Sequence, residues 1–466
     1  MRTKIICTIG PASDSEDMLR KLILAGMSVA RVNCSHGSLE ANEATIERIK
    51  KVRKDMGVPL AIMLDTKGPD IRIGRFADGA VMLNDGENFI LTTKTITGDV
   101  TRVSVDYKKL PKVIKPGQEL LLNDGFIKLV TQAVSETEIV TRVVQGGRLT
   151  DRKSLYAPGA VLGMPFISKL DELDLLMGIK TDCDYIAASF TSSTKDVTDM
   201  KKFLAKYGAN IPIIAKIEST GGVNDIDNIL KVADGIMTAR GDLGVEYPIE
   251  QIPTIQKLLT EKAVKAGKLI ITATEMLESM IEKPRPTRAE TTDVANAVYD
   301  GTSAIMLSGE TAVGKYPIQT VDYMKRIAEE AEQHVKYATN FYTNQVEINN
   351  TKEAFANTLT SAAISARAKA IVAFTQSGGT AIRISKYHPP CIIYAFARYE
   401  KVYHQMAMIN DIIPKLCSSI LTVAQMLKIS NDYVLDNKIA KKGEIIIVNA
   451  SFQDSDTDLV LIHPLN

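Results

Sequence analysis

The chain has 466 residues, and at roughly 150 residues per domain this length predicts about three domains. Hydrophobic residues make up 45% of it and charged residues 24%, as in ordinary globular proteins. The 56 lysines and arginines nearly cancel the 55 aspartates and glutamates, so the net charge of +1 argues against nucleic acid or a membrane surface as a partner.

Eight short runs rich in β-branched residues alternate with helix-like segments as far as about residue 320. With one exception, these runs start 24 to 35 residues apart, which is the pitch of a βα unit. They therefore predict a (β/α)₈ barrel, in the α/β fold class. The runs are residues 4–9, 29–33, 60–66, 185–190, 211–218, 235–240, 269–275 and 304–311.

Helix-start signals accompany these runs. Ser13 with Glu16, and Thr287 with Glu290, fit the S/T-x-x-E pattern in which the first side chain caps the helix and the acid caps it in return. We expect a helix to begin at each.

The exception to the regular spacing is a gap of 125 residues between the third run and the fourth. Its surplus, roughly Pro69 to Pro165, is rich in Gly, Asp and Thr and in short alternating runs, which predicts a small all-β insertion. Loops that follow barrel strands lie on the catalytic face, so this insertion is expected to cover the active site as a lid.

After about residue 340, a helix-like stretch is followed by five apolar runs that begin with "IVAFT" and end with "LVLIHP". Alternating helices and strands of this kind predict an open α/β domain. The chain is therefore divided into a barrel (1–69 with 165–340), an inserted β domain (70–164) and a C-terminal α/β regulatory domain (341–466).

The sequence predicts neither a membrane span nor a secretory signal. No apolar run approaches the ~18 residues of a span, and the mixed N-terminal stretch is too short for a signal peptide. The cysteines show no C-x-x-C spacing and the five histidines are scattered, which indicates reduced thiols in a cytoplasmic protein without a zinc site. Any metal is expected to be a hard cation held by oxygen. The cysteines are Cys7, Cys34, Cys183, Cys391 and Cys417.

Charged and polar residues gather at the carboxyl ends of the predicted strands, where barrels place their catalytic groups. Glu218 and Asp242 end consecutive strands, so they can lie side by side and hold Mg²⁺ together with water and substrate oxygens. Salt-bridged carboxylates are the alternative. Lys216 shares a strand face with Glu218. It can meet a phosphate, stabilise an enolate, form a Schiff base, or simply pair with Glu218.

Further candidates surround these three residues, and each has a structural alternative. Arg31 is either a second substrate-binding cation or half of a structural ion pair. Strand-end oxygens are either ligands of a cation or turn-forming groups. Thr274 and Gly241 either contact a ligand or serve the strand and its turn. Two basic residues that flank the insertion either reach the phosphates of a nucleotide or are ordinary surface side chains. The strand-end oxygens belong to Asn33, Ser35, Asp65 and Thr66, and the basic residues are Arg72 and Lys153.

In the last domain, "TQSGGT" lies between a strand and a helix-like segment. Small residues before a helix N-terminus form a ready anion site, because backbone N–H groups and the helix dipole both favour phosphate. The loop predicts an effector phosphate site at Thr375, Ser377, Gly378, Gly379 and Thr380.

Taken together, these motifs resemble the pyruvate kinase family over essentially the whole chain. The matching stretches, in family order, are "TKIICTIGPAS", "RVNCSHG", "LDTKGPDIR", "IIAKIE", "MTARGDLGVE", "TATEMLESM", "PTRAE", "DVANAV" and "IMLSGETAVGKYP". The resemblance implies a glycolytic enzyme that transfers the phosphoryl group of phosphoenolpyruvate to ADP and then protonates the enolate to pyruvate.

The resemblance also implies roles for individual residues. Lys216 would stabilise the transferring phosphoryl group and Arg31 would bind the substrate phosphate. Gly241, Asp242 and Thr274 would contact the substrate, with Thr274 tied to protonation. The remaining assignments are Mg²⁺ (or Mn²⁺) at Glu218 and Asp242, K⁺ at Asn33, Ser35, Asp65 and Thr66, and the nucleotide at Arg72 and Lys153. A homotetramer is implied as well.

The chain departs from the family pattern at a few positions. Asp70 replaces a glutamate common in K⁺-dependent members, so we expect K⁺ activation with altered affinity. Gly221 stands where an acidic or amide residue is usual, Ser192 where arginine is common, and Glu275 where glutamine is usual. The stretch "NASFQDSDTDLVLIHP" lacks the glycine-rich loop of members regulated by fructose 1,6-bisphosphate, which leaves the effector unassigned.

Two other functions fit parts of the pattern. A Mg²⁺-dependent 2-oxoacid aldolase would use Lys216 or the metal to activate pyruvate, but it would need no nucleotide clamp. A non-catalytic regulatory homologue would be favoured by loss of Lys216, Glu218 or Asp242, and all three are present.

Overall fold

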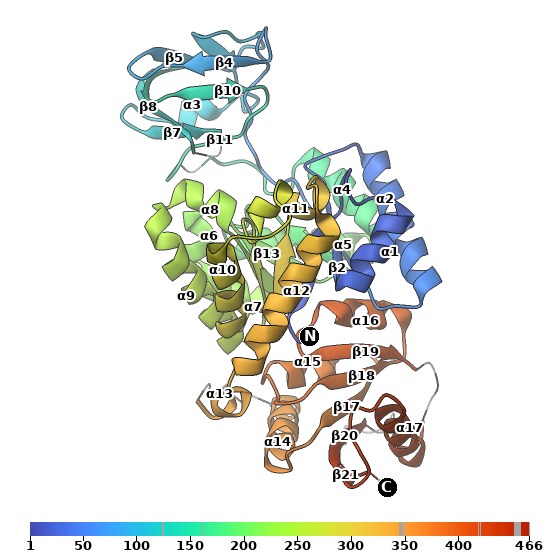
Figure 1. Ribbon diagram of the computed structural model, residues 1–466. Coiled ribbons are helices and arrows are strands. Elements are labelled where there is room, and N and C mark those ends of the chain that lie inside the picture. The colour runs from blue at the N-terminus through green and yellow to red at the C-terminus, as the bar shows by residue number, and fades with distance from the viewer. Residues whose placement is uncertain are drawn as a thin grey trace.

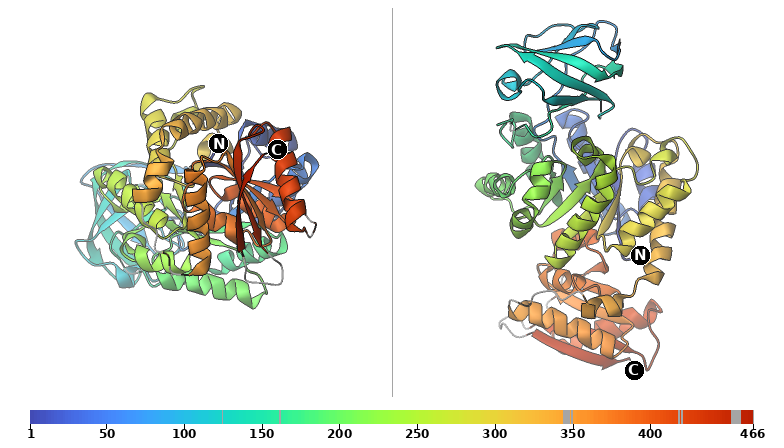
Figure 2. Two further views of the ribbon diagram at one scale, coloured as in Figure 1. Left: turned by 90° about the horizontal axis from the view of Figure 1, so that it is seen from below. Right: turned by 90° about the vertical axis from the view of Figure 1, so that its left-hand side faces the viewer.

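The computed structural model describes residues 1–465 apart from residues 124, 161, 344–347, 349, 418, 420 and 452–457. Three parts are stacked along one direction, with the inserted β domain at one end, the barrel in the middle and the C-terminal domain at the other end (Figure 1). The side view in Figure 2 shows the same order. Within the described residues, no helix combines the length and the apolar composition that crossing a membrane requires.

The eight predicted runs form the barrel, which confirms the predicted fold. Its strands are all parallel and close in the order β1-β16-β15-β14-β13-β12-β3-β2. Most of their residues are buried on both faces, which explains the nearly unbroken apolar sequence of each run. The strands are β1 (Lys4–Thr8), β2 (Val29–Asn33), β3 (Ala61–Asp65), β12 (Tyr185–Ala188), β13 (Ile213–Ile217), β14 (Gly235–Ala239), β15 (Leu269–Ala273) and β16 (Ala304–Leu307).

Helices surround the barrel. They are α1 (Glu16–Ala25), α2 (Leu39–Met56), α4 (Lys169–Lys180), α5 (Thr194–Lys206), α6 (Thr220–Asn224), α7 (Ile226–Val232), α8 (Arg240–Glu246), α9 (Ile252–Lys265), α10 (Arg288–Tyr299), α11 (Gly309–Ala312) and α12 (Pro317–His334). Their apolar sides pack against the strands in one large core.

One of the two predicted helix caps is confirmed and the other is wrong. Thr287 and Glu290 form a full capping box at the start of α10. Helix α1 is capped instead by Ser15, whose hydroxyl accepts a hydrogen bond from the amide of Met18. Ser13 lies earlier, in a turn, where its hydroxyl accepts a hydrogen bond of 3.1 Å from the amide of Gly10. The N-cap residue of α1 is therefore Ser15, two residues after the predicted Ser13.

The insertion between β3 and α4 is a small all-β domain, as predicted, and it has its own apolar core. It contains a six-stranded sheet in the order β11-β7-β8-β9-β5-β6 and a two-stranded sheet of β4 and β10, with one short helix, α3 (Leu110–Val113). Its strands are β4 (Ala80–Leu83), β5 (Asn88–Thr92), β6 (Arg102–Ser104), β7 (Glu119–Leu122), β8 (Ile127–Val134), β9 (Glu138–Gln145), β10 (Gly147–Thr150) and β11 (Leu155–Tyr156). We call it the lid.

The C-terminal domain is an open α/β sheet, again as predicted. Its order is β19-β18-β17-β20-β21, and only β21 among these described strands runs antiparallel to its neighbour. The strands are β17 (Ala370–Thr375), β18 (Ile393–Ala397), β19 (Ile412–Leu416), β20 (Ile445–Ser451) and β21 (Asp458–Pro464). The helices are α13 (Tyr337–Thr343), α14 (Thr351–Ser365), α15 (Gly379–Ser385), α16 (Glu400–Gln405) and α17 (Val423–Asp436). The "NASFQDSDTDLVLIHP" departure includes residues 452–457, which lie outside the described part of the chain.

The C-terminal domain closes the amino-terminal end of the barrel. Ala407 and Met408 from this domain pack into the same core as barrel residues such as Ile6 and Met63. A buried ion pair joins the two parts as well, because Nη1 of Arg2 lies 2.8 Å from Oδ1 of Asp411. This end of the barrel is sealed, and the opposite end faces the lid.

Candidate active site

The carboxyl ends of the barrel strands bring the predicted polar residues together on the lid side. Arg31 lies on β2, Asp65 ends β3, Lys216 lies on β13, and Glu218 follows it. All four are at least nine-tenths buried, with Asp65 and Glu218 at 0% and 2% exposure. Charges buried this deeply are tolerated only when they are paired.

Asp65 is the centre of this cluster. Its Oδ2 accepts a hydrogen bond of 2.6 Å from Nε of Arg31, and its Oδ1 lies 3.2 Å from Nζ of Lys216. Burial acts to raise the pKa of Asp65, but Arg31 and Lys216 together outweigh it and lower the pKa below its usual range. Nη1 of Arg31 also donates a hydrogen bond of 2.8 Å to Oγ1 of Thr8. Arg31 is therefore paired with Asp65 at the mouth of the barrel, an arrangement that fits either of the roles predicted for it.

Lys216 lies between two carboxylates. Its Nζ is 2.9 Å from Oε1 of Glu218 as well as 3.2 Å from Asp65. The same atom donates a hydrogen bond of 2.7 Å to Oγ of Ser189. Burial lowers the pKa of Lys216, but the two carboxylates outweigh it and raise the pKa above that of an ordinary lysine. The side chain is thus a fixed ammonium group, whereas a Schiff base requires a neutral amine.

Glu218 faces the other predicted carboxylate, Asp242. Oε2 of Glu218 accepts a hydrogen bond of 2.6 Å from the amide of Phe190. Burial raises the pKa of Glu218 to about 7; the charge of Asp242 adds to the rise and Lys216 opposes it. Two carboxylates that repel each other, one buried and one partly exposed, provide a favourable place for a cation.

The donor set fits a cation such as Mg²⁺. Within the described residues, no three or more His, Cys, Asp or Glu side chains gather in a way that could enclose a metal on their own. Mg²⁺ is usually bound by one or two carboxylates together with water and substrate oxygens, so two are sufficient. When Arg31, Lys216, Asp65, Glu218 and Asp242 are all ionised, the cluster carries one net negative charge. A divalent cation would make it positive and able to attract an anionic substrate.

Thr274 occupies a strained position beside helix α8. Its φ is +66°, which is a rare conformation for a β-branched residue, and Glu275 follows at +53°. Arg240 holds this backbone, since its Nε and Nη2 donate hydrogen bonds of 3.0 and 2.5 Å to the carbonyl oxygen of Thr274. The hydroxyl of Thr274 accepts a hydrogen bond of 2.9 Å from the amide of Gly241. Strain of this kind, retained against its cost, is typical of functional positions.

The four predicted cation-binding oxygens lie at the ends of β2 and β3. Asn33 and Asp65 are register partners on these adjacent strands. Oδ1 of Asn33 accepts a hydrogen bond of 3.1 Å from the amide of Ser35. Oγ1 of Thr66 accepts one of 3.2 Å from the amide of Ser189, which brings a further hydroxyl to this corner of the barrel.

The basic residues that flank the lid come together at its root. Arg72 pairs with Ser154 in an isolated antiparallel bridge, so Arg72 and Lys153 lie on neighbouring segments. Nε of Arg72 donates a hydrogen bond of 2.6 Å to Oδ2 of Asp70, whose pKa is raised by burial although Arg72 opposes the rise. Asp70, one of the departures from the family pattern, therefore pairs with one predicted nucleotide-binding residue.

The "TQSGGT" loop joins β17 to α15, as predicted. Gly378 has φ +81°, and its amide donates a hydrogen bond of 2.9 Å to Oγ1 of Thr375. A cavity of about 240 Å³ opens against the loop, and Ser377, Thr380 and Arg398 help to line it. The loop thus borders a cavity that Arg398 helps to line, and it belongs to the domain at the opposite end of the stack from the lid (Figure 1).

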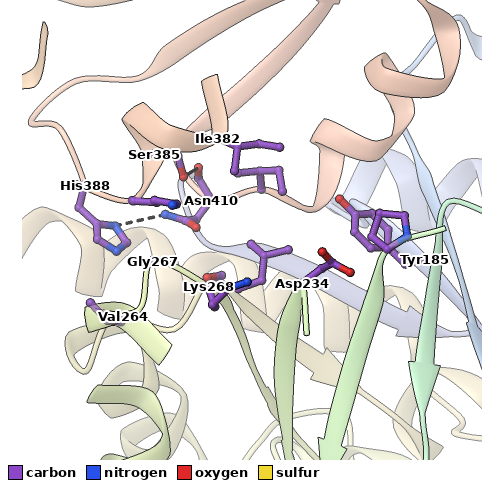
Figure 3. A pocket seen from close by; sticks show the side chains of 14 residues that line it. Tyr185, Asp234, Val264, Gly267, Lys268, Ile382, Ser385, His388 and Asn410 are labelled. Atoms are coloured by element: carbon purple, nitrogen blue, oxygen red, sulfur yellow. Dashed lines mark hydrogen bonds between the residues drawn. The ribbon is translucent and has the colours of Figure 1, made fainter. Parts of the chain in front are cut away.

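A second cavity, of about 270 Å³, lies at the sealed end of the barrel (Figure 3). Tyr185, Asp234 and Lys268 line it from the barrel side, and His388 and Asn410 line it from the C-terminal domain. Nδ2 of Asn410 lies 3.2 Å from Nδ1 of His388 across one wall. This cavity lies at the opposite ends of the strands from Lys216 and Glu218.

Two residues of the polar face were missed by reasoning from the sequence. Ser189 contacts both Lys216 and Asp65, and its place directly after the fourth barrel strand is a signal that could have identified it. Tyr156 lies on lid strand β11, and its hydroxyl donates a hydrogen bond of 2.8 Å to Oδ1 of Asp242. No local signal could have identified Tyr156, because the contact depends on how the lid sits on the barrel.

Comparisons with known proteins match this chain to one family. The family model described as "Pyruvate kinase, barrel domain" matches residues 1–321, and the model described as "Pyruvate kinase, alpha/beta domain" matches residues 353–463. A pyruvate kinase of Clostridium perfringens is 42% identical over 463 residues, which covers 98% of this chain and 97% of that protein. One from Geobacillus stearothermophilus is 40% identical over 472 residues, which covers 100% of this chain and 80% of that protein.

A solved structure gives the same result. The crystal structure of a pyruvate kinase from Cryptosporidium parvum superposes with a TM-score of 0.94 at 34% identity, and the match covers 100% of this chain and 96% of that one. Family models that span most of the chain, together with relatives at about 40% identity over its full length, leave one assignment. The chain belongs to the pyruvate kinase family.

Proposed function

We propose that the polar face beneath the lid is the site at which this chain performs the pyruvate kinase reaction. The chain is a glycolytic phosphotransferase that moves the phosphoryl group of phosphoenolpyruvate to ADP and yields pyruvate and ATP. The observation that carries the site assignment is the ammonium of Lys216, 2.9 Å from Glu218 and next to Asp242 at the carboxyl ends of the strands.

Phosphoryl transfer depends on positioning and charge neutralisation more than on covalent chemistry. Lys216, held in place by Asp65, Glu218 and Ser189, would neutralise charge on the transferring phosphoryl group. Arg31, oriented by Asp65, would bind the phosphate of the substrate. These two cations are oriented before substrate arrives, so little reorganisation is needed during the reaction.

The substrate would also contact helix α8 and the strained loop after β15. The amide of Gly241 and the hydroxyl of Thr274 already share a hydrogen bond there. We assign the protonation of the enolate to the Thr274 position, which Arg240 holds rigidly through the backbone carbonyl.

Mg²⁺ or Mn²⁺ would be held by Glu218 and Asp242, and when bound it supplies Lewis-acid stabilisation of phosphoryl and enolate oxygens. K⁺ would be held by Asn33, Ser35, Asp65 and Thr66, with Asp70 adjusting its affinity. Arg72 and Lys153, at the root of the lid, would meet the phosphates of the nucleotide.

Schiff-base chemistry of the aldolase type is disfavoured by geometry, because two carboxylates within 3.2 Å hold the side chain of Lys216 as an ammonium partner.

We also propose the domain limits 1–69 with 165–340, 70–164 and 341–466, a cytoplasmic location, a homotetramer and a phosphorylated effector. The effector would bind at Thr375, Ser377, Gly378, Gly379 and Thr380, beside the cavity lined by Arg398.

The test uses the purified full-length protein with phosphoenolpyruvate and ADP, with and without Mg²⁺ and K⁺. Pyruvate is expected only when a divalent cation is present, with further activation by K⁺. No pyruvate in the presence of both cations would overturn the proposal. The same assay with added sugar phosphates or nucleoside monophosphates identifies the effector, and light scattering after size exclusion gives the number of subunits.

A further inference from the structure

We infer that Tyr156 of the lid is a positioning residue for the divalent-cation site, and that it acts through the carboxylate of Asp242. This inference rests on the proposed function, in which Asp242 is a cation ligand. Nothing in the local sequence around Tyr156 suggests the role. It follows from the hydrogen bond between its hydroxyl and Oδ1 of Asp242, which joins the lid to the barrel.

The position of Tyr156 on its strand directs the side chain toward the barrel. In β11, Leu155 is buried in the core of the lid. Successive side chains on a strand point to opposite faces, so Tyr156 projects away from that core. Tyr156 is also the last residue of the lid sheet before the chain returns to the barrel, and it pairs with Leu121 of β7. Strand pairing therefore holds the backbone at Leu155 and Tyr156.

The lid meets helix α8 at a second point on the same side of the helix. Gly125 of the lid lies beside Val245, and a Cβ atom placed on Gly125 would be 3.8 Å from a methyl group of Val245. Asp242 and Val245 are three residues apart, so they share one face of α8. The lid thus rests on the face of the helix that carries the proposed cation ligand.

The hydrogen bond leaves Asp242 able to bind a cation. A carboxylate has two oxygens with several lone pairs, and Tyr156 uses one of them on Oδ1. Ligating carboxylates are commonly held by a hydrogen bond from a neighbouring residue, and loss of such a partner weakens metal binding by about 10- to 100-fold. Tyr156 therefore fixes the orientation of Asp242 and connects the seating of the lid to the strength of cation binding.

The experiment measures Mn²⁺ binding to the full-length protein without substrates, from the electron paramagnetic resonance signal of free Mn²⁺. Tyr156→Phe removes one hydroxyl and keeps the ring, and we expect it to weaken Mn²⁺ binding about tenfold. In the assay, the concentration of Mg²⁺ needed for half-maximal rate should rise, while kcat at saturating Mg²⁺ recovers. The matched control is Tyr107→Phe, which removes a hydroxyl that donates to the carbonyl of Leu162 and does not touch Asp242.

Two further variants separate this inference from the proposed function. Glu218→Gln and Asp242→Asn should each weaken Mn²⁺ binding strongly, and Tyr156→Phe should add nothing in the Asp242→Asn background. If Glu218→Gln and Asp242→Asn bind Mn²⁺ normally, the proposed cation site is wrong and the inference falls with it. If both bind poorly but Tyr156→Phe stays within twofold of the parent, or if Tyr107→Phe has an equal effect, only the role of Tyr156 is overturned.

Discussion

The two ends of the barrel are covered in different ways. At the amino-terminal end, the C-terminal domain is attached by the buried Arg2–Asp411 ion pair and by Ala407 and Met408 packed into the core of the barrel. At the carboxyl end, the lid rests on α8 through the half-buried side chain of Tyr156. Buried ion pairs and core packing are expensive to break, whereas a half-buried hydrogen bond is not. The C-terminal domain is therefore held on the barrel more firmly than the lid is.

The buried carboxylates at the two ends of the barrel also differ in how they are paired. Asp411 is satisfied by Arg2, His388 and Asn410. On the lid side, Glu218 faces Asp242, and its raised pKa reports an arrangement that a cation would improve. Asp411 is therefore balanced by groups of the protein, whereas the pair of Glu218 and Asp242 would gain from a bound cation.

The largest expected effect is at the end of the barrel that faces the lid. Lys216→Met should reduce kcat by at least about 10³-fold, because an oriented charge aimed at the reacting group is lost. The variant should still bind Mn²⁺, since Glu218 and Asp242 remain. Steady-state kinetics and Mn²⁺ titration check both points. Lys257→Met, at an exposed ion pair with Asp300, is the control, and near-normal turnover of Lys216→Met would refute the role given to Lys216.

The second prediction concerns the sealed end. Asp411→Asn should destabilise the protein by about 3 kcal/mol, because the neutral amide leaves the buried end of Arg2 without its counter-charge. Turnover at 25 °C should change little, since the site lies at the other end of the strands. Thermal melting and kinetics together test this. Loss of activity without loss of stability would contradict the division between the two ends, and Asp300→Asn is the matched control.

The third prediction is a pH dependence at the same junction. Burial alone would raise the pKa of Asp411, but the hydrogen bond and charge of His388, followed by Arg2, lower it from 3.8 to about 2. Because the pKa of Asp411 is depressed in the folded state, its ionised carboxylate stabilises the fold above about pH 4. This contribution to stability is lost as the pH falls toward 2. The loss should be about 2 kcal/mol. The free energies of unfolding of the parent and of Asp411→Asn should converge as the pH falls from about 4 to 2. A difference between them that stays constant down to pH 2 would refute the prediction.

The smallest expected effect concerns two departures from the family pattern that are neighbours in space. A Cβ atom on Gly221 would lie 3.2 Å from Cβ of Ser192. The arginine common at position 192 and the acidic or amide residue usual at position 221 are therefore both missing from one exposed place on the surface. Ser192→Arg and Gly221→Glu should couple favourably by about 0.5 kcal/mol, less at high salt. A double-mutant cycle from urea unfolding measures this coupling, and additive effects would show that the two departures are unrelated.

The eight barrel strands could be predicted because each is buried on both faces, so its apolar run is nearly unbroken. The grouping of the polar residues at the carboxyl ends of the strands could be predicted as well, because parallel strands place all of those ends on one face of the barrel. The cap of α1 was mispredicted for a local reason: Ser13 and Ser15 both fit a cap, and only the path of the turn after Gly10 decides between them.

Other features of the site could not be read from a linear pattern. The contact of Tyr156 with Asp242 requires the lid to be placed on α8. The closeness of Gly221 and Ser192 requires two loops from different strands to meet. The positive φ of Thr274 has no signal in its residue type, since threonine argues against it. Each depends on tertiary packing, which periodicity and spacing do not report.

The strained backbone of Thr274 also has a consequence for attempts to stabilise this protein. Glycine accepts a φ of +66° at no steric cost, so selection for stability alone would favour glycine at this position. A β-branched residue persists there with its backbone carbonyl clamped by Arg240 and its hydroxyl bonded to Gly241. A library of variants screened only for thermal stability should therefore be enriched in replacements of Thr274. The selected variants should be more stable and should have lost catalytic activity.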